Sequence, residues 1–155
     1  MELGAAVEGV DWAAFSAPSW FSPVAVRSAL AGIVLGQVES DVAWAVTALE
    51  DAVAHGHSGS LSPAAAPAVD VLLAVALRWR EAARAQALCS LSTFLSYEAV
   101  PPWTTYVRDG VTLDVETDIR ARIRAQLPLL QSLAAEPHPW QSNRKLARQL
   151  IEEAS

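Results

Sequence analysis

The amino-acid sequence predicts an all-α protein, an α-solenoid of about three stacked helical hairpins. Apolar residues recur at spacings of three and four along several stretches, as they do on one face of a helix. Two of these stretches open with a Ser-Pro pair, Ser22-Pro23 and Ser62-Pro63, and the two pairs lie 40 residues apart. A repeat of about 20 to 50 residues is typical of stacked hairpins, so we expect each stretch to begin one repeat.

Length and composition indicate one globular domain. The chain has 155 residues, of which 52% are hydrophobic and 18% are charged, and this balance excludes a disordered chain. Its single cysteine, Cys89, excludes an intramolecular disulfide and fits a reducing compartment. The acidic start lacks the features of a signal peptide, and the apolar runs 24–35 and 69–77 are shorter than the ~20 residues of a membrane span. We therefore expect a cytoplasmic protein.

The negative charge is concentrated in the first half of the chain. The net charge is −6, and residues 1–76 hold eight acidic side chains against one basic side chain, Arg27. Residues 77–155 are close to neutral. Neutralising phosphates supplies most of the affinity of general nucleic-acid binding, so an acidic protein is a poor candidate for it. The acidic half would instead steer a cationic partner toward the protein.

The predicted domain divides into an N-terminal cap and three repeats: 1–21, 22–56, 61–98 and 114–154. In the cap, Trp12 and Phe15 lie three residues apart. We expect these rings to cover the open end of the stack, because the terminal faces of a repeat protein would otherwise expose apolar surface.

In the first repeat, Ser22 is expected to cap a helix that begins at Pro23 and ends near residue 35 or 36. A second helix should begin at Ser40 or Asp41 and end at residue 53 or 54. The polar, glycine-rich residues 55–60 are expected to form a loop.

The second repeat should hold two helices that meet near residues 79–81. Ser62 is expected to cap the first helix, and Asp70, which interrupts an apolar run, should point to water. The buried stripe of the first helix is expected to contain Val69, Leu72, Leu73, Ala76 and Leu77. The buried stripe of the second helix is expected to contain Ala85, Leu88, Cys89, Leu91 and Leu95.

Residues 99–113 interrupt the repeat pattern and are expected to form a long loop. Pro101-Pro102 should end the preceding helix, and Asp109-Gly110 marks a turn. The loop also carries Trp103, Tyr106 and Arg108, residue types that dominate the energetics of protein interfaces.

The third repeat should begin with a helix over residues 115–135 that Pro128 breaks near Gln126. A last amphipathic helix over 140–153 should bury Leu146, Leu150 and Ile151. On the first of these helices, Glu116 lies four residues before Arg120 in an orientation that favours an ion pair. The arginines of this helix either form a solvated face balanced by acidic neighbours or clamp an anion: Arg120, Arg122 and Arg124.

Several motifs resemble HEAT repeats. The second helices begin with acidic residues, Asp41, Glu81 and Glu116, and Asp118-Ile119-Arg120 is similar to the acidic–aliphatic–arginine pattern of that family. The His-Gly loop, followed by the A-P-A-V core at residues 66–69, resembles small bacterial HEAT-like proteins. This resemblance implies a right-handed solenoid with one extended concave surface. Some proteins of this type are thought to be immunity proteins against secreted toxins. Trp44 stands where the family typically has an arginine.

The sequence contains no convincing catalytic motif. No Walker loop, dinucleotide fingerprint, H-E-x-x-H or G-x-S-x-G pattern is present, so we expect neither enzymatic activity nor a cofactor. His55 and His57 suggest a metal site with His138 or a carboxylate, but a glycine-rich loop is a poorly preorganised site. We therefore predict no metal.

The leading functional hypothesis is a non-catalytic protein-binding module, an immunity protein that neutralises a cationic bacterial toxin by occluding its active site. Its expected partner-binding residues are Asp41, Trp44, Glu50, Asp51, Trp103, Tyr106 and Arg108. We expect it to bind neither nucleic acid nor membrane, and to be a monomer or weak homodimer. One alternative is a HEAT-like glycosylase, with Asp118 beside Arg120 and Arg124 acting on nucleic acid. Another is a scaffold or oligomerisation protein.

Overall fold

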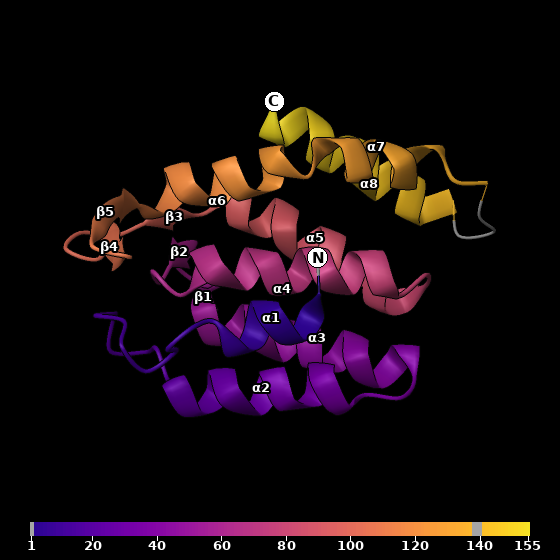
Figure 1. Cartoon of the computed structure of the whole chain (residues 1–155). Helices are drawn as coiled ribbons and strands as arrows, with labels where there is room; N and C mark the ends of the chain where they lie inside the picture. Colours follow the sequence, from indigo (N-terminus) through magenta and orange to yellow (C-terminus); the bar gives the residue numbers. More distant parts are fainter. Residues whose placement is uncertain (1, 138–140) are drawn as a thin grey trace.

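A computed structural model describes residues 2–137 and 141–155 (Figure 1). This part of the chain is mostly helical, as the sequence predicts, with eight helices and two small sheets. The helices lie in successive layers, from α2 at the bottom of Figure 1 to α7 and α8 at the top. In the described residues, no helix is both long enough and apolar enough to span a membrane.

The N-terminal segment packs along the middle of the stack. Helix α1 (Leu3–Glu8) contacts α4 more extensively than α2. Trp12 is buried, and its indole N–H donates to the carbonyl of Val7 at 3.1 Å. Phe15 is half-buried, with its ring centroid 6.5 Å from that of Trp12. The segment therefore reaches the central helix of the protein, a contact that the sequence did not indicate.

Helices α2 (Pro23–Leu35) and α3 (Glu39–Val53) form the first hairpin, with the predicted bounds within two residues. The amide of Ala25 donates to the hydroxyl of Ser22 at 3.3 Å, which confirms Ser22 as the helix cap. The two helices approach closely at Gly32, where an added Cβ would lie 2.9 Å from the Cβ of Ala45.

Helix α4 (Ala65–Arg78) is the central helix, in contact with α1, α3, α5 and α6. It is buried on nearly all sides, and not only along the predicted stripe. Two predictions about it are wrong. The hydroxyl of Ser62 is buried without a hydrogen-bond partner, because α4 starts later, after a turn in which the Ala65 amide donates to the Ser62 carbonyl at 3.0 Å. Asp70 does not point to water but pairs with Arg122 of α6.

Helix α5 (Ala82–Ser96) buries most of the predicted stripe, since Leu88 and Leu91 are fully buried and Ala85 and Leu95 are half-buried. Cys89 is exposed, whereas Arg84 is buried. The guanidinium of Arg84 donates to the carbonyl of Ala76 at 2.7 Å and to the carboxylate of Glu136 at 2.8 Å. These two acceptors balance a buried positive charge. The prediction is wrong for Cys89, because apolar spacing alone places this residue in the stripe and does not indicate a buried arginine whose partners lie on other elements.

Short strands occur where the sequence predicted only loops. Strands β1 (Ala54–His55), β2 (Ser60–Leu61) and β3 (Glu98–Ala99) form one small sheet, in the order β1-β2-β3. Strands β4 (Thr105–Arg108) and β5 (Val111–Asp114) form an antiparallel hairpin. The predicted turn at Asp109-Gly110 is confirmed, and both residues have positive φ, 51° and 76°. An Asp-Gly pair between β-branched residues is a hairpin signal that the loop interpretation overlooked.

The last three helices are α6 (Val115–Ala125), α7 (Leu127–Ala135) and α8 (Gln141–Ala154). The predicted break at Gln126 is confirmed. Helix α6 packs against α4, and α8 packs against α5 and α7. Leu150 is fully buried, as predicted, while His138 and Trp140 lie outside the described residues.

The carboxylate of Glu39 caps the N-terminus of α5 from a distant part of the chain. It accepts hydrogen bonds from the amides of Arg80 (2.9 Å), Glu81 (3.1 Å) and Ala83 (2.9 Å). The first amides of a helix have no acceptor within that helix, and its positive end favours a carboxylate. Glu39 therefore joins the first hairpin to the second.

We expect Glu39→Ala to lower the free energy of unfolding by about 1–2 kcal/mol, the usual effect of losing a charged helix cap. Urea unfolding followed by circular dichroism measures this loss. Asp41→Ala is the matched control, because Asp41 lies in the same first turn of α3 and is exposed. If both variants lose the same free energy of unfolding, the negative charge of Glu39 stabilises α3 itself and does not act by capping α5.

Candidate functional site

The expected partner-binding residues of the first repeat lie on helix α3. Asp41, Trp44, Ala48 and Asp51 are all exposed, and their spacing of three and four places them on one side, which we call the α3 face. Trp44 is 77% exposed. Glu50 is turned away from this face, because its carboxylate accepts a hydrogen bond from the hydroxyl of Ser90 on α5.

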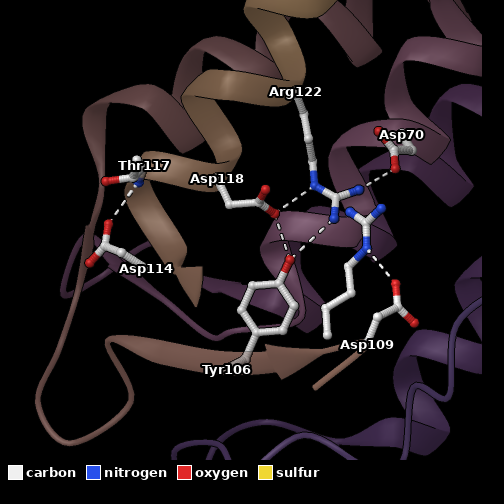
Figure 2. Close-up of polar contacts among 8 residues, drawn as sticks. Asp70, Tyr106, Asp109, Asp114, Thr117, Asp118 and Arg122 are labelled. Carbon is white, nitrogen blue, oxygen red and sulfur yellow. Dashed lines mark hydrogen bonds and ion pairs between the residues drawn. The ribbon is translucent and has the colours of Figure 1, made fainter. Parts of the chain in front are cut away.

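The expected binding residues of the 99–113 segment do not form one exposed group. Trp103 and Tyr106 are half-buried, and only Arg108 is exposed. The guanidinium of Arg108 lies 3.7 Å from the carboxylate of its neighbour Asp109. Tyr106 points from β4 toward α6, where its hydroxyl takes part in a polar network (Figure 2).

The polar network consists of Asp70, Tyr106, Asp118 and Arg122, which come from α4, β4 and α6; we call it the Arg122 network (Figure 2). Tyr106 donates to the carboxylate of Asp118 at 2.5 Å. Arg122 donates to Asp118 at 2.7 Å, to the Tyr106 hydroxyl at 3.1 Å and to the carboxylate of Asp70. The side chain of Arg122 is only 11% exposed, so one guanidinium holds the hairpin and the two helices together.

Burial shapes the protonation of two members of this network. It raises the pKa of Asp70, although the nearby charge of Arg122 acts in the opposite direction. Burial and the hydrogen bond to Asp118 raise the pKa of Tyr106. Tyr106 therefore stays protonated at neutral pH and can donate to Asp118, while the charged form of Asp70 depends on the cation beside it.

A cleft of about 790 Å³ lies next to the Arg122 network. We call it the hairpin cleft. Its walls are α1 with the segment that follows it and strand β4, and Asp70 and Arg122 also line it. The α1 side is largely apolar and ends at Phe15, whose ring centroid lies 5.8 Å from that of Tyr106. The cleft thus has one apolar wall and a charged floor.

The arginines of α6 do not form the solvated face that the sequence suggested. The side chain of Arg122 is largely covered, at 11% exposed. Arg120 and Arg124 donate to carbonyls at the end of α8: Glu153 at 2.7 Å, Ala154 at 2.5 Å and Ser155 at 2.9 Å. Glu116 accepts from the amide of Ala99 at 2.9 Å instead of pairing with Arg120. Asp118 accordingly lies beside Arg122, and not in a groove with Arg120 and Arg124.

The histidine loop holds its rings in local contacts. The ring of His55 stacks on Trp20 with centroids 5.5 Å apart, and its Nδ1 atom lies 2.8 Å from the Ser58 hydroxyl. His57 is exposed, and His138 lies outside the described residues. Within residues 2–137 and 141–155, no group of three His, Cys, Asp or Glu side chains is arranged to hold a metal ion.

Comparisons of the chain with protein-family models, with curated proteins and with solved structures give no match. The functional argument therefore rests on the chain itself. The structure adds Asp70 and Phe15 to the residues of interest and gives Asp118 and Arg122 a different role from the one that the sequence suggested. One signal for this site was present in the sequence, because Asp70 is the single charged residue between Leu61 and Leu77.

Proposed function

We propose that the protein is a non-catalytic module that binds a cationic protein through the α3 face. The observation that carries the proposal is Trp44, a large apolar ring that is 77% exposed between the exposed carboxylates of Asp41 and Asp51. Tryptophan is among the residues that contribute most to interface affinity, and the surrounding carboxylates favour a partner of positive charge. The excess of acidic side chains in residues 1–76 also favours a partner of positive charge.

We propose further that the three hairpins form a HEAT-like solenoid. Supporting this, the second helices of successive hairpins lie against each other, α3 on α5 and α5 on α8, and α4 lies against α6, whereas α4 packs on α1 and not on α2. A solenoid of this kind displays an extended surface, and its role lies in the partner that this surface binds. By the resemblance to small bacterial HEAT-like proteins, the partner is a toxin domain whose active site is covered in the cytoplasm.

The test is co-purification and titration calorimetry with the product of a neighbouring gene, together with an assay of protection from its toxicity. Trp44→Ala is expected to weaken binding about 30-fold, the effect of removing about 2 kcal/mol from an interface. The Asp41→Lys/Asp51→Lys double variant should abolish protection, and the affinity of the wild type should fall as salt is added. Glu152→Lys, at an exposed carboxylate of α8, is the matched control.

Unchanged affinity and unchanged protection in both α3 variants would exclude the α3 face as the binding surface. Loss of protection in the Glu152→Lys control to the same degree would show that net charge, and not this face, governs the interaction. Circular dichroism of each variant confirms that the fold is intact before binding is compared.

A further inference from the structure

The hairpin β4–β5 has an unpaired edge. In its register, Arg108 pairs with Val111, Tyr106 with Leu113 and Val107 with Thr112. Antiparallel pairs alternate between hydrogen-bonded and non-hydrogen-bonded, and the pair that flanks a two-residue turn is hydrogen-bonded. At the open end of the hairpin, the amide of Val115 donates to the carbonyl of Thr104 at 2.9 Å. This hydrogen bond fits the same alternation of hydrogen-bonded and non-hydrogen-bonded pairs. The N–H and C=O groups of Thr105 and Val107 therefore point away from β5.

The hairpin cleft lies along this strand. Every residue from Thr105 to Asp109 lines it, whereas β5 contributes only Thr112. The cleft volume of about 790 Å³ falls within the range of about 300–1,000 Å³ that holds bound ligands. An exposed strand edge beside a cleft is suited to an extended peptide, which pairs with the edge through its main chain and places alternate side chains in the cleft.

The charges that line the cleft favour a basic peptide. The cleft is lined by three carboxylates, of Asp11, Asp70 and Asp109, and by two guanidinium groups, of Arg108 and Arg122. Arg122 is already shared with Asp118, which adds a further negative charge beside the cleft. Asp70 receives its hydrogen bond from Arg122 on one oxygen, Oδ2, and no donor within the described part of the chain bonds the other oxygen. That oxygen is available to a second cation.

We propose that the hairpin cleft binds an extended basic peptide, which adds to β4 as a third strand and places a lysine or arginine side chain against Asp70. The apolar wall formed by α1 and Phe15 would contact the side chains that alternate with the basic ones. This site is separate from the α3 face, so its test is independent of the function proposed above.

The experiment measures fluorescence anisotropy with a labelled, end-blocked peptide of alternating valine and lysine. Val107→Pro removes the outward amide of β4 but no hydrogen bond of the hairpin, so it should weaken binding about 10-fold. Val107→Ala shortens a side chain that lines the cleft but keeps the amide, so it should weaken binding by no more than about 3-fold. Thr112→Pro removes the corresponding amide on the β5 edge, at the β5 residue that lines the cleft, and should weaken binding less than Val107→Pro does. Asp70→Asn should weaken binding of the lysine peptide about 10-fold and leave binding of a valine–serine peptide unchanged.

Circular dichroism checks that each variant is folded. If Val107→Pro does not fold, wild-type protein with a peptide methylated at alternate backbone nitrogens provides the same test, and should bind about 10-fold more weakly. The proposal is overturned if the lysine peptide does not bind the wild type, or if a valine–glutamate peptide binds equally well. It is also overturned if Thr112→Pro, and not Val107→Pro, removes binding, or if N-methylation has no effect.

Discussion

Replacing Leu72 by aspartate is expected to unfold the protein. Leu72 is fully buried in α4, the helix that contacts α1, α3, α5 and α6. Losing a buried leucine side chain costs about 2–5 kcal/mol, and an unpaired carboxylate in the same place adds several more. The sum approaches the whole stability of about 5–15 kcal/mol that is typical of a domain. Far-UV circular dichroism should show loss of the helical signal at 25 °C, a temperature at which the wild type is folded.

The matched control is Leu35→Asp, because Leu35 is also helical but is 72% exposed. Its effect on the free energy of unfolding should stay within about 1 kcal/mol, which includes an unfavourable charge at the end of α2. If Leu72→Asp keeps the helical signal and melting temperature of the wild type, α4 is not the core helix of the protein.

Some helix boundaries, unlike the start of α4, were predictable because local chemistry sets them. Ser22-Pro23 starts α2, Pro128 separates α6 from α7, and Asp109-Gly110 forms the turn that its sequence indicates. A capping hydroxyl, a missing amide or a positive φ acts on the backbone within a few residues. These signals therefore operate before any tertiary contact is known.

The environment of α4 was not predicted, because an amphipathic pattern was assumed for every helix. From Ala65 to Ala76 its residues are buried, apart from Asp70, which is partly exposed. A helix that is apolar all round belongs at the centre of a protein. The sequence contains this signal, but the apolar spacing of three and four predicts one buried and one exposed face and places Asp70 on the exposed face.

In the candidate site, the placement of a side chain was predictable only where that side chain has no hydrogen-bond or ion-pair partner in the described part of the chain. Trp44 is exposed as expected, since no element of the described chain covers the outer side of α3. Arg122 was misplaced because its acceptors include Asp70, which lies 52 residues away. Sequence spacing reveals charge pairs one helical turn apart, such as Asp118 and Arg122, but not those that tertiary packing creates.

Replacing Arg122 by methionine should lower the free energy of unfolding by about 3–5 kcal/mol, the usual cost of removing one partner from a buried ion pair. Methionine keeps much of the side-chain volume, so the loss reports mainly on charge and hydrogen bonds. Asp70 and Asp118 would remain in place without their shared cation, and Tyr106 would lose one of its two partners. Urea unfolding measures the change, with Arg148→Met, at an exposed arginine of α8, as the control.

The pH dependence of this loss separates the neutralisation of Asp70 from the other contacts that Arg122 makes. Burial already raises the pKa of Asp70 above its ordinary value of 3.8, and removing Arg122 takes away the largest effect that lowers it. A raised pKa in the folded state means that protonation favours folding, so stability falls as pH rises from 3.8 through the raised pKa. The deficit of Arg122→Met relative to the wild type should therefore be smallest below pH 3.8 and largest at neutral pH. A deficit of equal size across this range would mean that Arg122 stabilises the fold through contacts that do not depend on the charge of Asp70, such as its hydrogen bond to the Tyr106 hydroxyl, and not by neutralising Asp70.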